Sequence, residues 1–187
     1  EADYHSTSGQ TTPYLLCGAR IVCRGRRYLC GMGIDISGRR KQEEILRLRE
    51  RALHAASNGL VITRCTEGDN PIEYVNPAFE RISGYSAAEV IGRDSRFMGA
   101  PGLDEDERER LRVAIRSRQQ VNVVFRNRRK NGEIFWNDLT ITPVADGSNR
   151  VTHFIGVIND ITASRQRTAL LEHEVNHDPL TGLANRT

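Results

Sequence analysis

The sequence of 187 residues lacks a long apolar run, since no stretch approaches the roughly 18–20 consecutive apolar residues that a membrane-spanning helix needs. We therefore expect no membrane contact by this chain and a cytoplasmic location. The chain starts and stops abruptly, which predicts that it is a piece of a longer protein. An anchor in the inner membrane elsewhere in that protein is compatible with this expectation.

Metal-binding and nucleic-acid-binding signals are also missing. The four cysteines form no CxxC pair and no histidine stands at zinc-ligand spacing, which predicts free thiols and no structural metal. The net charge is +3, from 27 basic and 24 acidic residues, and this small excess does not indicate nucleic-acid binding. No paired acids and no nucleophile with a neighbouring base can be assembled, so catalysis by this chain is not expected.

The first part of the chain, residues 1–38, contains a predicted β-hairpin. Alternating apolar residues from Tyr14 to Ser37 predict two strands around a turn at Arg24-Gly25-Arg26. Two strands alone cannot bury a core, so we expect this hairpin to lean on a neighbour or to exchange with another chain.

Residues 39–56 predict a linker helix that is rich in Glu, Arg and Leu. Its apolar residues recur at alternating three- and four-residue spacing, as in a parallel coiled coil, at Ile45, Leu48, Ala52 and Ala55. The same pattern fits a single amphipathic helix that lies on its own domain.

Residues 57–162 predict one compact α+β unit. Asp104 is the expected N-cap of a helix that ends near Arg118, because acidic residues crowd its first turn. The Asn-Gly of Lys130-Asn131-Gly132 predicts a hairpin turn. The expected strands are Gly59–Arg64, Ile72–Val75, Val121–Arg129, Glu133–Thr142 and Arg150–Thr162, and the expected short helical turns are Pro77–Ser83 and Ser86–Ile91. A second linker helix, residues 163–178, follows with Thr168, Leu171 and Val175 on one seam.

A series of motifs in the central unit resembles the PAS domain family. In chain order they are IEYVNPAFE with ISGY (72–85), AEVIGR (88–93), FWN (135–137), HFIGV (153–157) and the exit DIT (160–162). The resemblance implies an antiparallel five-stranded sheet with flanking short helices. Gly33-Ile34-Asp35-Ile36-Ser37 is similar to that exit, so residues 1–38 resemble the last hairpin of a preceding PAS domain.

The stretch GRDSRFMG (92–99) resembles the flavin-binding signature of LOV domains, a PAS subclass. Ser95 stands where the photoreceptors carry the cysteine that bonds to the lit flavin. A hydroxyl is a far poorer nucleophile than a thiol, so the resemblance implies a flavin pocket without the light chemistry.

The resemblance also implies the ligand residues. Arg96 and Arg112, sixteen residues apart, match the two arginines that hold the flavin phosphate. Asn127 and Asn137 match the amides that meet the polar edge of the ring, and each alternates with apolar neighbours, which predicts that they face inward.

Three departures accompany Ser95. Ile158 replaces the glutamine whose amide responds to the flavin, and Asp94 and Gly99 replace amide residues near the ring or the ribityl chain. Asp94 could instead cap the adjacent turn. We therefore expect a sensor of flavin redox state, with FAD favoured and FMN as the alternative.

Two other readings of the same unit remain. A haem-binding PAS domain commonly needs a histidine on the long helix, and residues 104–118 contain none. A cofactor-free PAS domain used for dimerisation or partner contact is the stronger rival.

The end of the chain, HDPLTGLANR (177–186), resembles the entry of GGDEF domains, the diguanylate cyclase family. Residues 179–187 would then begin a truncated output domain, in a parent protein of cyclic di-GMP metabolism that could also carry an EAL-type phosphodiesterase. Because such cyclases work as facing pairs, a homodimer through both linker helices is expected.

Overall fold

The computed structural model describes residues 2–5, 11–100 and 102–176 and divides into two units, Glu1–Ala52 and Leu53–Thr187. The motif predicted at 177–186, and with it the start of a GGDEF domain, lies outside the described residues. The side chain of Val175, which was expected on the seam of the second helix, is also outside them.

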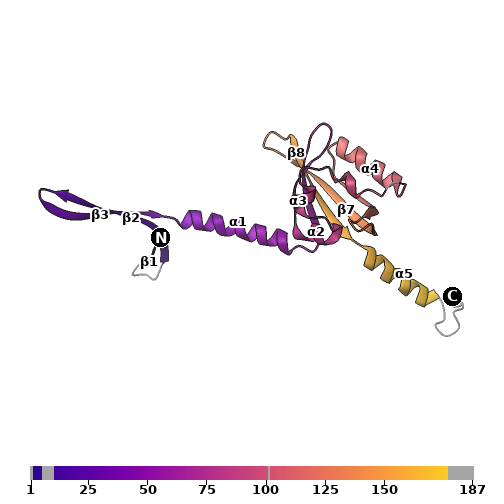
Figure 1. Ribbon diagram of the computed structural model, residues 1–187, viewed down its shortest axis with the longest axis horizontal. Helices are drawn as coiled ribbons and strands as arrows, with labels where there is room; N and C mark the ends of the chain where they lie inside the picture. Colours follow the sequence, from indigo (N-terminus) through magenta and orange to yellow (C-terminus); the bar gives the residue numbers. More distant parts are fainter. Residues whose placement is uncertain (1, 6–10, 101, 177–187) are drawn as a thin grey trace. The chain divides into compact units, whose positions relative to one another are not determined.

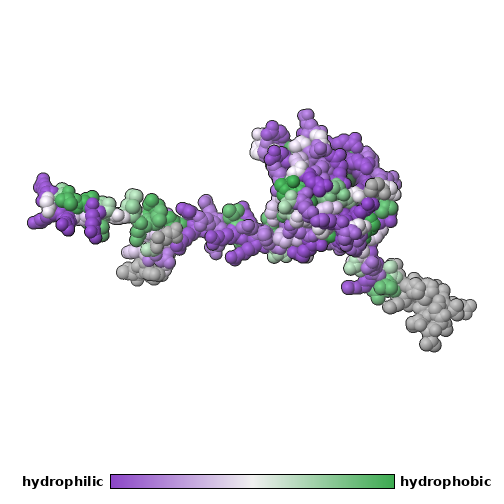
Figure 2. Space-filling model, viewed as in Figure 1, coloured by the Kyte–Doolittle hydropathy of each residue, from purple (hydrophilic) through white to green (hydrophobic). Residues whose placement is uncertain are grey.

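The first unit contains a long β-hairpin. Strands β2 (Thr11–Cys23) and β3 (Arg26–Asp35) pair antiparallel from Tyr14↔Asp35 to Cys23↔Arg26, and Gly25 turns the chain with φ of +75°. A short strand, β1 (Ala2–His5), which the sequence patterns did not predict, pairs with β2. Helix α1 (Ser37–Ala55) follows and buries none of its residues. Figure 2 shows apolar side chains along the hairpin, and these are exposed: Leu16, Ile21, Val22, Leu29 and Met32.

The second unit is built on a five-stranded antiparallel sheet with the strand order β5-β4-β8-β7-β6. Figure 1 labels β7 and β8 of this sheet and the helices α2, α3 and α4 of the same unit. This architecture confirms the predicted α+β class. Two of its strands match the predicted bounds at both ends, β4 (Gly59–Arg64) and β5 (Ile72–Val75). The other three have both ends within three residues of the predicted bounds: β6 (Val121–Arg128), β7 (Ile134–Ala145) and β8 (Val151–Asp160).

Short helices connect β5 to β6 and lie to one side of the sheet. They are α2 (Pro77–Ser83), α3 (Ala87–Val90), the 3-10 helix η1 (Ser95–Met98) and the longer α4 (Glu105–Arg116). Asn76 begins α2 because its side-chain oxygen accepts the N–H of Phe79, and Gly84 ends it in a left-handed conformation with φ of +77°. The core between helices and sheet contains Val61, Ile72, Phe79, Val90, Phe125, Phe135 and Leu139.

Asp104 occupies the N-cap position of α4 that the sequence predicts, but its carboxylate does not cap the helix. Its φ of +54° places it in the left-handed region, and its side chain caps no helical N–H. The carboxylate instead accepts the backbone N–H of Arg126 at 2.8 Å and the guanidinium of the same residue at 3.0 and 3.1 Å. A cation on the neighbouring strand thus takes the carboxylate away from the helix end. The helix also stops at Arg116, and Arg118 is left-handed with φ of +55°.

Both long helices leave the sheets through the same hydrogen-bonded turn. Before α1, Ser37 N–H donates to Asp35 Oδ1 at 2.8 Å and Ile36 N–H donates to Pro13 O at 3.0 Å. Before α5 (Thr162–Asn176), Thr162 N–H donates to Asp160 Oδ1 at 3.0 Å and Ile161 N–H donates to Trp136 O at 3.0 Å. The exit motif therefore has one geometry at two places in the chain.

Candidate functional site

A cavity of about 600 Å³ lies between the sheet of the second unit and the segment from η1 to α4. The structure brings together at this cavity every residue that the sequence singles out as a ligand contact: Asp94, Ser95, Arg96, Arg112, Asn127, Asn137 and Ile158. Gly99 lines it as well. The arrangement offers a volume within the range of small-molecule and cofactor sites.

The strands supply the inner wall by simple alternation. Successive side chains of a strand point to opposite faces, so every second residue reaches the cavity. The wall residues are Val61 and Thr63 on β4, Phe125 and Asn127 on β6, Asn137, Leu139 and Ile141 on β7, and Phe154, Gly156 and Ile158 on β8.

Asn127 and Asn137 are the polar groups of this wall. Asn137 is 1% exposed and Asn127 is 5% exposed, and the side-chain oxygen of each is buried without a hydrogen-bond partner among the described residues. Asn127 is opposite Phe135 and Asn137 is opposite Phe125, so the two amides are diagonal neighbours on one face of the sheet. An unpartnered buried oxygen costs about 1–3 kcal/mol, which a ligand that donates a hydrogen bond would recover.

Asn76 shows what a structural asparagine looks like in the same unit. It is fully buried, and its oxygen accepts the N–H groups of Leu60 at 2.8 Å and Phe79 at 3.0 Å. Its amide nitrogen donates to Leu53 O at 3.0 Å and Asn58 O at 3.1 Å. The unmet oxygens of Asn127 and Asn137 are therefore a feature of the cavity and not of buried asparagines in this fold. They fit a ligand with a polar edge, such as the flavin ring.

Asp94 caps η1, the alternative role that the sequence left open. Its Oδ1 accepts the backbone N–H of Arg96 at 2.9 Å, and its Oδ2 accepts that of Asn70 at 3.0 Å. Burial raises the pKa of Asp94, but the hydrogen bonds from Arg96 and Asn70 outweigh it and hold that pKa below its ordinary value. Asp94 is thus an anion at the cavity, and Ser95 follows it as the first residue of η1.

Arg96 and Arg112 lie at the rim of the cavity with side chains 69% and 51% exposed. Arg96 donates to Asp94 at 2.8 Å and also pairs with Asp69. Arg112 pairs with Glu109 at 2.7 Å and Glu105 at 3.4 Å. Both guanidinium groups therefore have carboxylate partners that a ligand phosphate would have to share or displace.

Ile158 is buried in the wall and has no side-chain hydrogen-bonding group. It lies on β8 between Gly59 of β4 and Leu139 of β7. The side chain at this position therefore offers no hydrogen bond to a ligand in the cavity.

Sequence reasoning missed Arg108, which also lines the cavity. It projects from α4 and its guanidinium carbon lies 4.9 Å from the centre of the Phe125 ring. The available signal was its spacing, since Arg108 and Arg112 are four residues apart and share one helix face.

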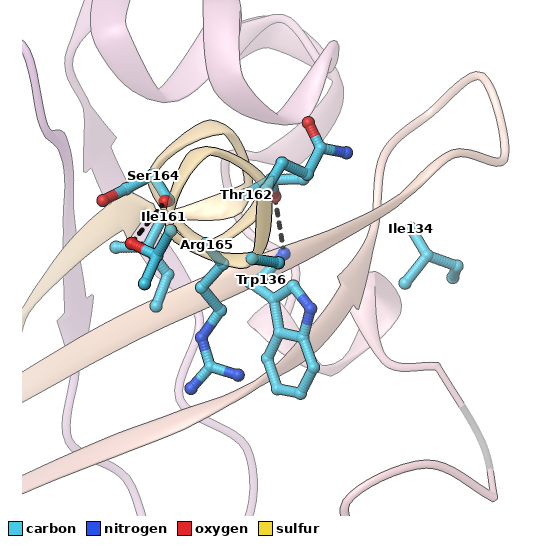
Figure 3. A pocket seen from close by; sticks show the side chains of 9 residues that line it. Ile134, Trp136, Ile161, Thr162, Ser164 and Arg165 are labelled. Atoms are coloured by element: carbon cyan, nitrogen blue, oxygen red, sulfur yellow. Dashed lines mark hydrogen bonds between the residues drawn. The ribbon is translucent and has the colours of Figure 1, made fainter. Parts of the chain in front are cut away.

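A second hollow lies where α5 leaves the sheet (Figure 3). Thr162 Oγ1 accepts the backbone N–H of Trp136 at 2.8 Å, and the guanidinium carbon of Arg165 lies 4.1 Å from the centre of the Trp136 ring. Trp136 is next to Asn137 in β7, so the side chains of these two residues point to opposite faces of the sheet. The strand thus joins the cavity to the start of α5.

His153 on β8 has protein partners at both ring nitrogens. Its Nε2 lies 3.1 Å from a Glu73 carboxylate oxygen and its Nδ1 lies 2.9 Å from Thr152 Oγ1. In the part of the chain that the structure describes, no cluster of three or more potential metal ligands occurs, and no helix has the length and apolarity to cross a membrane.

Comparison with known proteins identifies the class of this architecture. The family model described as "PAS domain" matches residues 57–163, which is more than half of the chain. The chain belongs to the PAS domain family.

The curated proteins similar to this chain include blue-light receptors and a transcriptional activator. The chain is 37% identical over 122 residues to a blue-light photoreceptor of Listeria innocua, covering 65% of this chain and 48% of that protein. It is 37% identical over 115 residues to a blue-light-activated histidine kinase of Brucella canis, covering 62% of this chain and 24% of the kinase. It is 39% identical over 116 residues to the bacterioopsin transcriptional activator of Halobacterium salinarum, covering 62% of this chain and 17% of the activator. The chain spans less than half the length of these curated relatives.

Solved structures give the same class. The LOV domain of the Erythrobacter litoralis blue-light activated histidine kinase is 37% identical with a TM-score of 0.53, over 56% of this chain and 96% of that one. An RNA-binding light-oxygen-voltage receptor is 34% identical with a TM-score of 0.63, over 87% of this chain and 43% of the receptor. A structure named for a flavin analogue in a LOV domain is 33% identical with a TM-score of 0.57, over 66% of this chain and 92% of that chain.

Proposed function

We propose that this chain is a flavin-binding sensory module that passes the redox state of its flavin to an output domain through helix α5. The observation that carries the proposal is the pair of buried, unpartnered oxygens of Asn127 and Asn137 in the wall of the cavity. The similarity to LOV domains supports a flavin as the ligand with the matching polar edge.

The residues that would hold the flavin divide into two groups. Asn127 and Asn137 would meet the polar edge of the ring, and the apolar wall around Leu139 and Phe154 would meet its faces. Arg96 and Arg112 at the rim would bind the phosphate, since a guanidinium offers two parallel donors to phosphate oxygens.

The identity of the flavin is a finer proposal. We favour FAD, because cysteine-free redox sensors that resemble this chain generally carry it, with FMN as the alternative. The exposed positions of Arg96 and Arg112 are compatible with a phosphate at the rim and with a longer group that continues beyond it.

A bound flavin would supply redox chemistry, because its ring takes up and releases electrons and protons. The chain supplies the response. With Ile158 unable to form a hydrogen bond, Asn137 is the polar group nearest in sequence to the helix contacts of Trp136. A difference of about 1–3 kcal/mol between two arrangements of this strand would change the output several-fold or more.

We assign the output and the flanking segments on the sequence motifs. The sequence at 177–186 favours a GGDEF-type domain of cyclic di-GMP metabolism, whereas the Brucella relative is a histidine kinase. Because cyclases of the GGDEF type work as facing pairs, a homodimer through α1 and α5 is part of the proposal. The shared exit turn at Asp35 and Asp160 supports residues 1–38 as the end of a preceding PAS domain.

The purified protein tests the proposal directly. It should be yellow, and chromatography of the released chromophore should identify FAD or FMN. The variant Asn137→Leu should lose flavin, because it replaces the amide with an apolar group of similar size. The matched control Asn122→Leu changes an exposed asparagine of β6, which is outside the cavity lining, and should retain it.

A cofactor-free dimerisation module is the second candidate. The carboxylate partners of Arg96 and Arg112 favour it, because both rim cations are already neutralised by the protein. A colourless protein that takes up neither FAD nor FMN when each is supplied in excess would establish this second function and end the first.

A further inference from the structure

Arg108 differs from the other arginines of the cavity in its partners. Arg96, Arg112 and Arg116 each pair with at least one carboxylate. Arg108 forms no ion pair with any carboxylate of the described residues. It donates only to backbone oxygens, from Nε to Leu103 O at 2.9 Å and from Nη2 to Arg126 O at 2.6 Å.

The guanidinium of Arg108 is held in place and partly buried. It lies over the Phe125 ring, and the two backbone oxygens fix its plane between α4 and β6. Burial lowers the pKa of this side chain more than the charges of Glu105 and Asp104 raise it, and the nearby Arg112 adds to the lowering. Arginine stays charged through such a shift, so the cavity contains one cation that no protein anion neutralises by direct contact.

This cation is next to the unmet amides. Arg126, whose oxygen accepts from Arg108, precedes Asn127 in β6. Gly99 forms an isolated bridge with Asn127, and a Cβ atom at Gly99 would lie 3.5 Å from Arg108 Nη1. Arg108 therefore lies beside the part of β6 that carries Asn127, and Arg108, Asn127 and Asn137 line the same cavity.

We infer that Arg108 is a further binding residue of this cavity, which donates to carbonyl oxygens on the polar edge of a flavin ring. The inference rests on the proposed function and adds a donor that the LOV-type residue pattern does not provide. The pyrimidine edge of a flavin presents carbonyl oxygens on either side of an N–H. One of the two asparagine oxygens can accept from the N–H, and the guanidinium has N–H groups left to donate to the carbonyl oxygens.

Binding of two flavins tests the inference. Lumiflavin has the ring but no phosphate, and FMN has both. Arg108→Gln should weaken the binding of both flavins about tenfold or more, because a hydrogen bond from a charged donor is lost. Arg112→Gln should weaken the binding of FMN and leave the affinity for lumiflavin unchanged. The matched control is Arg110→Gln on the same helix, since Arg110 pairs with Glu107 and is not among the cavity residues.

The midpoint potential of bound FMN distinguishes a residue that contacts the flavin from one that only supports the fold. A cation beside the polar edge stabilises negative charge added on reduction, so Arg108→Gln should shift the potential to more negative values and Arg110→Gln should not. If Arg108→Gln does not fold, Arg108→Lys keeps the positive charge without the paired N–H donors of the guanidinium. This variant should bind lumiflavin more weakly and leave the potential near that of the unmodified protein.

The outcomes distinguish the two proposals. If the unmodified protein binds neither flavin, the proposed function fails and the inference fails with it. If it binds both, the inference alone is overturned when Arg108→Gln matches Arg110→Gln in lumiflavin affinity or in potential, or when Arg108→Lys matches Arg110→Gln in lumiflavin affinity. Weaker lumiflavin binding together with the expected potentials supports it.

Discussion

The hydroxyl oxygen of Thr162 accepts the backbone N–H of Trp136 at 2.8 Å, which joins the first residue of α5 to strand β7. The second unit contains other contacts that hold this exit, but this one is made by a single side chain that can be changed without altering volume.

Thr162→Val should loosen the start of α5. The substitution removes the acceptor and leaves the Trp136 N–H without it, which costs about 1–3 kcal/mol of unfolding free energy. Amide hydrogen exchange at Trp136 should become faster, and urea unfolding measures the change in the free energy of unfolding. Thr168→Val is the matched control, because the Thr168 hydroxyl contacts only Ser164 O on the surface of α5. Equal effects of the two substitutions would show that the Thr162 contact does not hold the helix.

Asp160 should make the stability of the exit depend on pH. Burial raises the pKa of its carboxyl, but the hydrogen bonds from Arg129 and Thr162 outweigh it and hold the pKa below its ordinary value. The contribution of the carboxylate to the free energy of unfolding is therefore fully present above about pH 4 and is lost as the pH falls through the folded-state pKa.

Asp160→Asn should consequently cost about 1 kcal/mol at pH 7, a small figure because the pair is partly exposed. The difference between the variant and the unmodified protein should shrink below about pH 4 in urea titrations. Asp106→Asn changes an acidic residue in the exposed first turn of α4 and serves as the control. A constant difference from pH 7 to pH 3 would contradict the role assigned to Asp160.

Ser95→Cys should add a light response to the flavin-loaded protein. The substitution places a thiol where LOV photoreceptors carry their reactive cysteine, on a residue that lines the cavity. Blue light should then reduce the visible absorbance reversibly in the variant, whereas the unmodified protein and Ser95→Ala should show no such reversible change. A variant that binds flavin and still gives no light response would mean that residue 95 does not face the ring.

Asp69→Asn should strengthen the binding of flavins that carry a phosphate. Asp69 pairs with the exposed guanidinium of Arg96, so its removal leaves that cation more available. FMN affinity should rise a few-fold while lumiflavin affinity stays the same, as measured by fluorescence titration. Asp106→Asn again supplies the same change of charge away from the cavity. A rise in lumiflavin affinity of the same size would show that the effect does not come from the phosphate.

The sequence predicted the parts of this structure that depend on local pattern. Alternation of apolar residues indicated all five strands of the second unit, and Asn131-Gly132 indicated the hairpin, in which Gly132 has φ of +90°. The inward direction of Asn127 and Asn137 followed from the same alternation, because a strand has a period of two whatever its neighbours are.

Prediction from the sequence was incomplete where a charged side chain has several possible partners. Asp104 had the residue type and position of an N-cap, but Arg126 on β6 binds its carboxylate instead. Arg108 resembled any other arginine of a charged helix, and only the packing of α4 over Phe125 places it in the cavity. The short strand β1 was missed because its four residues carry too little pattern.

The amino-acid sequence by itself determined the family, the order of the strands along the chain and the faces that their side chains take, since these follow from residue types and a fixed backbone period. The tertiary structure alone decided which ions pair, which amide oxygens of the cavity are left without a partner and which arginine of the cavity forms no ion pair. Those outcomes depend on distances between segments that are far apart in the chain, and hydrogen bonds and ion pairs act over only a few ångströms.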